Sequence, residues 1–343
     1  MAERYRIGIA GLDHWYVGLA AAEIAARDPR MELVAIAHRH PGRLQEAGAR
    51  FGAAHTTGDY RSVVERDDVD IVVTACPTSE NPDLVVAAAR AGKHIVSVKP
   101  IAMTVAEGDR IIGAVRENGV RFISNESAYR TFPAITRIKD WVDAGRLGRP
   151  VSAYTAFRAP LPRQGWPGSL EPTWWLDPTK SPGGGWIDHA IYHIDVLRWL
   201  FAGEVRSISG LTANLVHRDL GPGMEDFGVA SVVFDRGEVA VIEVSWTATP
   251  DGSYEAFHVV GTEGQAVSDP TTTGKVSVVG RFEVPGWFQV DAAPQSYSML
   301  PHLVDVLEGD GAQVAGVEDA RENLAACLAF YQAARTGRSV QPG

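Results

Sequence analysis

Short apolar runs alternate with amphipathic stretches along the first 124 residues of the chain. The apolar runs are rich in β-branched residues and have the length of strands. They are residues 5–10, 31–37, 69–75, 93–98 and 120–124. Between them, apolar side chains recur at helical spacing in residues 41–51, 81–92 and 104–119. Strands that are apolar on both faces and separated by helices indicate parallel βαβ units, so the pattern predicts a doubly wound parallel sheet over residues 1–124.

Two of these helices carry boundary signals of their own. Thr104 stands where an N-cap is expected, and Glu107 three residues later completes a capping box. Gly92 and Gly119 lie just past the ends of their helices, where a residue with positive φ ends the last turn.

The pattern changes after about residue 148, where strand-like stretches with alternating polarity follow one another. These stretches are residues 149–159, 204–216, 225–235, 238–248, 253–264 and 274–280. Several are joined by short glycine-containing turns, which are typical of antiparallel hairpins. Two helices, 185–201 and 321–336, complete an α+β domain with a large open, mainly antiparallel sheet. We predict that this second domain covers residues 125–343, and its last helix could pack back on the first domain.

The first strand runs into the turn GLDHWY, where a dinucleotide-binding Rossmann domain would hold a pyrophosphate. Gly11, Asp13 and Tyr16 occupy the three glycine positions of G-x-G-x-x-G, so only the first glycine is present. A carboxylate repels a pyrophosphate, and Asp13 is therefore expected to point away and cap the following helix. Backbone N–H groups at the helix start can still bind phosphate. The residues expected to line the cofactor here are Gly8, Gly11, Leu12, Asp13 and His14.

The second strand ends in His38 and Arg39, where an acidic residue would bind the ribose diol of NAD. A basic pair at this place can accept the 2′-phosphate of NADP, although two solvated polar residues would give the same sequence. The pair favours NADP slightly over NAD.

Charge and composition narrow the class of partner. The chain of 343 residues has a formal net charge of −10, which argues against general binding to nucleic acid or to an anionic membrane. Its two cysteines, Cys76 and Cys327, do not indicate a disulfide framework. No apolar run reaches the roughly 18 residues of a membrane span, and the first strand leaves no room for a signal peptide. We expect a cytoplasmic protein.

Three motifs carry a resemblance to a known family. They are CPTSEN at residues 76–81, GKHIVSVKPIAMT at 92–104 and WWLDPTKSPGGGWIDHAIYHIDVLRWL at 174–200. The chain resembles the Gfo/Idh/MocA family of glucose–fructose oxidoreductases and inositol dehydrogenases over essentially its whole length. The resemblance implies a nicotinamide-dependent dehydrogenase that acts on a secondary hydroxyl of a sugar, cyclitol or related polyol.

The resemblance also assigns roles to single residues. Lys99 and Pro100 match the family's E-K-P motif, which supplies a catalytic lysine, while Val98 replaces the glutamate. In the loop that the family places beside the nicotinamide, Pro77 is kept and Asn81 stands where histidine is usual. The cofactor-binding residues implied by these motifs are Cys76, Pro77, Asn81 and Lys99.

Asp188 fits the aspartate of the family's substrate-domain signature, which has a catalytic histidine about one helical turn later. Aligned without a gap, that histidine falls on Tyr192, and His193 follows immediately. Residues four apart share a helix face, so Asp188 and Tyr192 project together, and His189 and His193 form a neighbouring pair turned by about 100°. Either Tyr192 or His193 could supply the polar group near a substrate hydroxyl.

Lysine can act as the base for alcohol oxidation when its surroundings favour the neutral amine. In this hypothesis Lys99 removes the hydroxyl proton, and Asp188 holds other hydroxyls or orients its neighbour. Further candidates for substrate contact are Trp166, Trp174, Trp175, Trp186, Arg158, Arg163, Asp177 and Lys180.

Other classes of function fit some of the same residues. The degenerate turn would suit a non-catalytic nucleotide- or sugar-binding regulator, although Lys99 and Asp188 count against one. An NAD-dependent glycoside-cleaving enzyme would use the same groups. His189 and His193 have the spacing of two zinc ligands, but no third ligand is indicated and no metal is expected. The open sheet favours a homodimer or homotetramer assembled through it.

Overall fold

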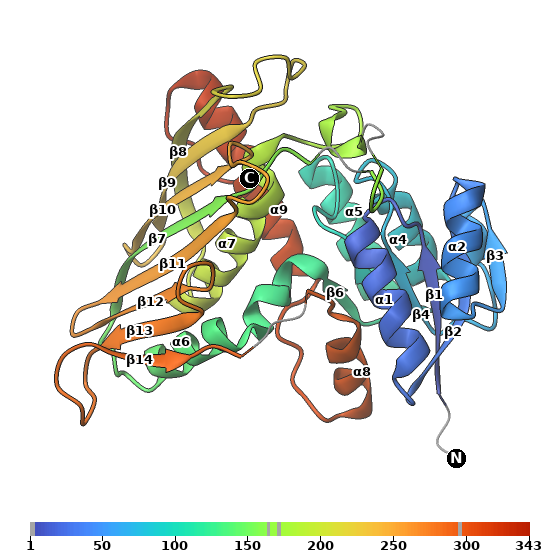
Figure 1. Ribbon diagram of the computed structural model, residues 1–343, viewed down its shortest axis with the longest axis horizontal. Helices are drawn as coiled ribbons and strands as arrows, with labels where there is room; N and C mark the ends of the chain where they lie inside the picture. The colour runs from blue at the N-terminus through green and yellow to red at the C-terminus, as the bar shows by residue number, and fades with distance from the viewer. Residues whose placement is uncertain (1–3, 163–164, 170–172, 294–296) are drawn as a thin grey trace. The chain divides into compact units, whose positions relative to one another are not determined.

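The computed structural model describes residues 4–162, 165–169, 173–293 and 297–343, which form two compact units (Figure 1). Unit 1 combines residues 1–128, 163–182 and 297–324, and unit 2 combines residues 129–162, 183–296 and 325–343. The predicted domain boundary after residue 124 stays a prediction. Within the described part of the chain, no helix has the length and apolar character needed to cross a membrane.

A six-stranded parallel sheet forms the centre of unit 1, in the order β3-β2-β1-β4-β5-β6. Its strands are β1 (Tyr5–Ala10), β2 (Met31–Ala37), β3 (His55–Thr57), β4 (Ile71–Thr74), β5 (His94–Ser97) and β6 (Phe122–Ser124). The order reverses at β1, which lies between β2 and β4. Ligands of doubly wound sheets bind outside the carboxyl ends of the strands at such a reversal. The predicted doubly wound sheet is confirmed.

Helices pack against this sheet, and all of them except α8 connect its strands. They are α1 (Trp15–Arg27), α2 (Pro41–Phe51), α3 (Tyr60–Val64), α4 (Asn81–Arg90), α5 (Val105–Asn118) and α8 (Leu300–Glu308). The capping box of Thr104 and Glu107 forms as predicted, and Gly92 and Gly119 have φ of 72° and 63°.

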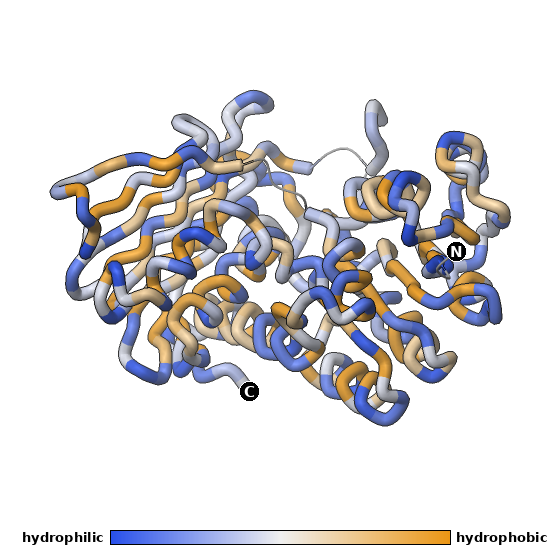
Figure 2. Tube along the Cα trace, turned by 90° about the horizontal axis from the view of Figure 1, so that it is seen from below, coloured by the Kyte–Doolittle hydropathy of each residue, from blue (hydrophilic) through white to orange (hydrophobic). Residues whose placement is uncertain are grey.

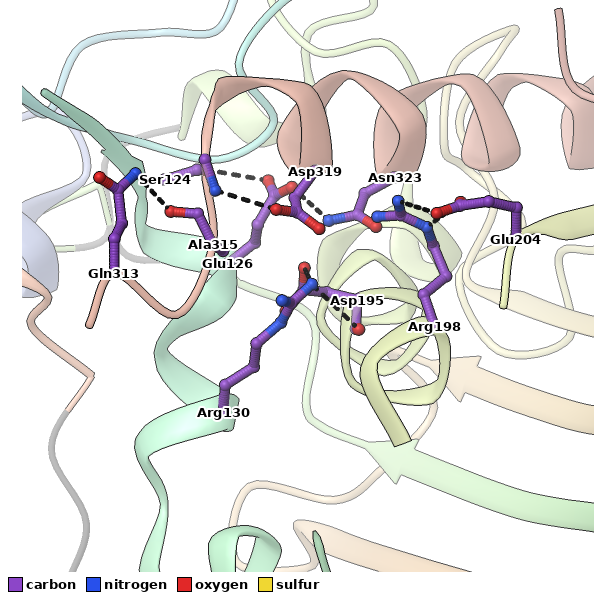
Figure 3. A network of polar contacts seen from close by, with 11 residues as sticks. Ser124, Glu126, Arg130, Asp195, Arg198, Glu204, Gln313, Ala315, Asp319 and Asn323 are labelled. Carbon is purple, nitrogen blue, oxygen red and sulfur yellow. Dashed lines mark hydrogen bonds and ion pairs between the residues drawn. The ribbon is translucent and has the colours of Figure 1, made fainter. Parts of the chain in front are cut away.

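Residues 297–324 are joined to this sheet by side-chain hydrogen bonds, some of which appear in Figure 3. Asn323 Nδ2 donates to Glu126 Oε1 at 2.9 Å, and Gln313 Nε2 donates to the carbonyl oxygen of Phe122 at 2.8 Å. Phe122 belongs to the edge strand β6, so a late segment of the chain completes unit 1.

Unit 2 is built on an eight-stranded sheet in the order β14-β13-β12-β11-β7-β10-β9-β8. The strands are β7 (Pro150–Arg158), β8 (Val205–Ala213), β9 (Phe227–Phe234), β10 (Val239–Ser245), β11 (Tyr254–Gly261), β12 (Gln265–Asp269), β13 (Lys275–Val279) and β14 (Phe288–Asp291). Neighbours are antiparallel except β7 and β10, which are parallel. The predicted open, mainly antiparallel sheet is confirmed.

One face of this sheet is covered by α7 (Gly185–Phe201) (Figure 1). In β10, Ala240, Ile242 and Val244 are buried, while Val239 and Val241 are exposed on the other face. Figure 2 shows the alternation of apolar and polar positions along these strands. The remaining helices are α6 (Pro133–Asp143) and α9 (Val317–Thr336), whose residues from 325 onward belong to unit 2; short 3₁₀ helices are η1 (Asn125–Thr131) and η2 (Trp174–Leu176).

Candidate active site

The turn after β1 keeps a glycine where the backbone requires one. Gly11 has φ of +100°, and a Cβ built on it would lie 3.0 Å from backbone atoms of Ala75 and Cys76. The His14 N–H donates to the Ala75 carbonyl oxygen at 2.9 Å, which holds the turn against the end of β4. The N-terminus of α1 is therefore held at the carboxyl ends of the strands, where a dinucleotide would bind.

Two other residues expected at the cofactor serve internal packing. A Cβ on Gly8 would lie 2.7 Å from Val63 Cγ1, so this glycine lets α3 approach β1. Leu12 is fully buried, and its side chain lies against Gly18 on α1.

Asp13 does not cap α1, and that prediction is wrong. Among the described residues no side chain caps this helix, and the Asp13 carboxylate instead accepts a hydrogen bond from Tyr60 Oη at 2.6 Å. Burial raises the pKa of Asp13 to about 6, although the Tyr60 hydrogen bond opposes the shift. A carboxyl group with this pKa is still mainly ionised at pH 7.

Tryptophans that were candidates for substrate stacking pack on this turn in unit 1. Trp175 Nε1 donates to His14 Nε2 at 2.8 Å, and Trp174 Nε1 donates to the Asp13 carbonyl oxygen at 3.2 Å. Both rings stack on His14, with centroids 4.8 and 4.9 Å away. Both tryptophans contact the turn that is proposed to hold the nucleotide. We therefore expect them to affect binding of the cofactor before binding of the substrate.

Neither residue of the basic pair after β2 carries a charge that is free for a phosphate. His38 is buried, stacks on Trp166, and has its pKa lowered to about 4 by burial, so it is neutral at pH 7. Arg39 forms a two-pronged ion pair with Glu80, with Nη1 2.7 Å from Oε1.

Lys99 lies two residues beyond β5 and is 1% exposed. Asn81 holds the loop around it: its amide nitrogen donates to Ser97 Oγ at 2.9 Å and to the Ile101 carbonyl oxygen at 2.8 Å, and its oxygen accepts from Thr74 Oγ1 at 2.6 Å. These bonds occupy both amide hydrogens. Asn81 was expected to touch the cofactor, but its side chain instead positions the loop that carries Lys99. Thr74 and Ser97, which bind Asn81, were not among the residues predicted from the sequence.

Cys76 and Pro77 lie in the loop after β4, as the family motif implies. The Cys76 thiol is fully buried, and burial raises its pKa well above the usual value, which keeps it protonated. The Pro77 carbonyl oxygen accepts from the Glu80 N–H at 3.0 Å, forming the turn that starts α4.

In unit 2, a carboxylate missed by sequence reasoning holds the start of α7. Glu225 accepts hydrogen bonds from the N–H groups of Gly184 and Trp186, at 3.1 and 2.9 Å, and from Tyr331 Oη at 2.7 Å. Burial raises its pKa to about 7 despite these donors. A Cβ on Gly184 would lie 2.4 Å from the Glu225 carbonyl oxygen, so the glycine-rich turn is needed for this close approach.

Asp188 lies in the first turn of α7. Its Oδ2 accepts from Trp246 Nε1 at 3.0 Å and lies 3.2 Å from His189 Nδ1. The His189 ring stacks on Phe157 of β7, with centroids 3.5 Å apart. The carboxylate is thus fixed by Trp246, which directly follows β10, and by His189 of α7, whose ring rests on β7.

Tyr192 and His193 face different surroundings on α7. The Tyr192 ring stacks on Tyr129, with centroids 4.7 Å apart. His193 is fully buried, with Phe257 against its edge, and its Nε2 lies 3.9 Å from Glu255 Oε1, both on β11. Burial lowers the pKa of His193, which is therefore neutral at pH 7. His193 packs against the sheet.

A buried ion pair fixes the segment that carries Tyr129 (Figure 3). Arg130 Nε and Nη2 each lie 2.7 Å from a carboxylate oxygen of Asp195, which is one turn after Tyr192 on α7. The bidentate contact ties η1 to α7 and so holds the two tyrosine rings together.

The remaining candidates have local partners. Trp186 is fully buried and stacks on Phe330 at 3.7 Å, so its role is packing. Arg158 pairs with Glu243, and Asp177 with Thr179 and Lys180. Arg163 lies outside the described residues.

Within the described residues, no three His, Cys, Asp or Glu side chains are grouped to hold a metal ion. The catalytic candidates are divided, with Lys99 in unit 1 and Asp188, Tyr192 and His193 in unit 2.

Known proteins share the sequence pattern and the fold of this chain. The chain is 27% identical to the scyllo-inositol 2-dehydrogenase (NAD(+)) of Bacillus subtilis, over 98% of this chain and 94% of that protein. It is also 27% identical to the 1,5-anhydro-D-fructose reductase of Ensifer adhaerens, over 96% and 98% of the two chains. Its fold matches a levoglucosan dehydrogenase in complex with NADH, with a TM-score of 0.84 at 22% identity over 99% of this chain and 100% of that one. Residues 5–126 match the model of the oxidoreductase family with an NAD-binding Rossmann fold and residues 135–267 match its C-terminal domain model, so the chain belongs to the GFO/IDH/MocA family of oxidoreductases.

Proposed function

We propose that this protein transfers hydride between a nicotinamide cofactor and a secondary hydroxyl of a sugar, cyclitol or related polyol. The observation that carries the proposal is Lys99, a buried lysine at the carboxyl end of β5 in the unit that matches an NAD-binding model. Relatives that act on inositol and on anhydrofructose support the substrate class.

The residues of unit 1 fit a dinucleotide at the carboxyl ends of the parallel strands. The N-terminus of α1 lies beside this turn, where the positive end of the helix dipole favours a pyrophosphate, and Gly11 allows close approach of the backbone. The hydrogen bond that Tyr60 Oη donates to the Asp13 carboxylate partly offsets its negative charge. When bound, the nicotinamide accepts the hydride in oxidation and returns it in reduction.

In the oxidation direction, the substrate loses a hydride from carbon and a proton from its hydroxyl oxygen. Lys99 Nζ receives that proton, and in the reverse direction it returns the proton to the carbonyl oxygen. Of the two candidates on α7, we assign Tyr192 to a hydrogen bond with a substrate oxygen, because His193 is packed against Phe257 and Glu255 on the sheet. Asp188, held by Trp246, accepts hydrogen bonds from neighbouring substrate hydroxyls.

The test separates cofactor binding from chemistry. Purified protein is titrated with NADH and NADPH by nicotinamide fluorescence, and turnover is then measured on a panel of sugars and cyclitols. We expect micromolar binding, and we expect Lys99→Gln to bind the nucleotide with less than about threefold change while kcat falls by about 10²-fold or more.

Lys93 offers a matched control, because it stands at the opposite end of β5. Lys93→Gln removes the same charge and is expected to leave kcat within about twofold of the wild type. Binding without turnover in the wild type on any polyol would instead support a nucleotide-binding regulator. Absence of binding to a folded protein would refute the oxidoreductase proposal.

Two further properties belong to this proposal. We propose a homodimer or homotetramer formed through the outer face of the unit 2 sheet, where Tyr154, Val239 and Val241 are exposed. Cys76 and Cys327 are buried and form no disulfide, which supports a reducing compartment such as the cytoplasm.

A further inference from the structure

Side chains that follow the first four strands of unit 1 meet at the carboxyl ends of these strands. Asp13 follows β1, Arg39 follows β2, Tyr60 follows β3 and Glu80 follows β4. The Arg39 guanidinium binds the Glu80 carboxylate through both nitrogens and lies 4.6 Å above the centre of the Tyr60 ring. Tyr60 in turn donates to Asp13. Because β2 and β4 flank β1, the Arg39–Glu80 pair bridges the two strand ends beside the nucleotide turn.

A cavity of about 250 Å³ lies beside this pair, and its charged lining is Arg39, Asp59, Arg61, Glu80 and Asp83. Among the described residues of the lining, both arginines are engaged: Arg39 by Glu80 and Arg61 by Glu65 at 2.6 Å. His38, at the same strand end, is buried and neutral. The lining thus presents three carboxylates and two paired guanidinium groups.

We propose that Glu80 sets the choice of cofactor and makes this site select NAD over NADP. Its carboxylate holds Arg39, the cation that would otherwise bind a 2′-phosphate. It also brings to the sheet edge, from β4, the acidic group that is missing at the end of β2. This inference rests on the proposed function, because it requires a nicotinamide dinucleotide at this edge. It replaces the slight preference for NADP expected from His38 and Arg39.

The physical basis is repulsion at a partly solvated position. A 2′-phosphate near Arg39 would lie close to the Glu80 carboxylate, whereas a free 2′-hydroxyl can donate a hydrogen bond to it. The side chain of Glu80 is 31% exposed and that of Arg39 is 59% exposed, so solvent screens the pair and moderates the effect. Glu80 precedes α4 without capping it through its side chain, so removal of its charge leaves the helix start intact.

The experiment compares NADH and NADPH dissociation constants by nicotinamide fluorescence, at one ionic strength, in the full-length protein. We expect the wild type to bind NADH at least about tenfold more tightly than NADPH. Glu80→Gln should tighten NADPH binding about tenfold and change NADH binding less than about threefold. In the double variant Arg39→Ala/Glu80→Gln this gain should disappear, because the freed guanidinium is absent.

Asp83→Asn is the matched control. Asp83 lines the same cavity with the same charge, but it pairs with Arg110 at 2.8 Å instead of Arg39. The ratio of the two dissociation constants should stay within about twofold of the wild type. Thermal unfolding of each variant verifies folding, and Glu80→Ser repeats the measurement if the glutamine variant is unstable.

Three results would overturn the inference: a wild type that prefers NADPH, a ratio that Glu80→Gln leaves unchanged, or an equal shift in Asp83→Asn. If neither nucleotide binds to any folded variant, the proposed function fails and the inference with it. The two failures are distinguishable, since nucleotide binding remains measurable in the first and is absent in the second.

Discussion

Tyr192 is the residue in unit 2 on which the proposed chemistry depends most. Its ring is held by Tyr129, whose neighbour Arg130 is fixed by Asp195 on the same helix as Tyr192. Tyr192→Phe keeps this stacking and removes only the hydroxyl. We expect kcat to fall by about 10²-fold while the NADH dissociation constant changes less than about twofold. Steady-state kinetics and fluorescence titration measure the two quantities.

His193→Gln provides the contrast at the adjacent position. His193 is buried between Phe257 and Glu255, so its replacement should lower the unfolding midpoint and reduce kcat by less than about tenfold. A larger loss of kcat in His193→Gln than in Tyr192→Phe would contradict the assignment.

At this scale, residues whose role depends on a local motif were predictable and those with distant partners were not. The proline that follows Lys99 identifies it as part of the family motif, and the strand before Gly11 identifies it as the first glycine of the nucleotide turn. Asp13 was expected to act on its own helix, but its partner Tyr60 stands 47 residues later. Arg39 and Glu80 are 41 residues apart, and no local pattern reveals that the carboxylate neutralises the arginine.

The start of α7 is an element whose stability should depend on pH. Glu225 is nearly fully buried, and its pKa rises from 4.5 to about 7 in the folded protein. A raised pKa means that folding favours the protonated form, so this contribution to stability is present below pH 4.5 and is lost as pH rises through 7. The shift corresponds to about 3 kcal/mol.

Glu225→Gln should remove this dependence. Between pH 5 and pH 8, we expect the wild type to lose about 2 to 3 kcal/mol more unfolding free energy than the variant, measured by urea denaturation. At pH 5 the variant should be less stable, because its amide group faces a backbone N–H donor. Tyr331→Phe removes one donor from the carboxylate and should extend the wild-type decline to higher pH. Parallel pH profiles for wild type and Glu225→Gln would contradict the expected linkage.

Most elements were predictable because hydrophobic periodicity and end signals agree in them. Gly119 and the Thr104–Glu107 box mark α5 at both ends, and α7 has the predicted bounds of residues 185–201. The strand β3 was missed because its three residues, His-Thr-Thr, are polar and lie at the sheet edge. The parallel pairing of β7 with β10 was also missed, since register between distant strands leaves no mark in either sequence.

At the scale of the whole molecule, the two compact units interleave along the chain in three segments each. The change of pattern near residue 148 indicates that there are two kinds of architecture. It cannot indicate that residues 163–182 and 297–324 return to unit 1, because that depends on contacts such as Trp175 with His14 and Gln313 with Phe122.

The proposed assembly through the unit 2 sheet is the property of the whole molecule that one substitution tests best. Val241 and Tyr154 are opposite each other on the parallel strands β10 and β7, and both side chains point away from α7 with 38% and 39% of their surface exposed. A charge placed there would have to be buried in a dimer, so Val241→Glu should convert the oligomer to a monomer, as measured by light scattering behind size exclusion. Val284→Glu, a similar exposed valine between β13 and β14, should leave the mass unchanged. A wild-type monomer, or an unchanged mass for Val241→Glu, would contradict assembly through this face.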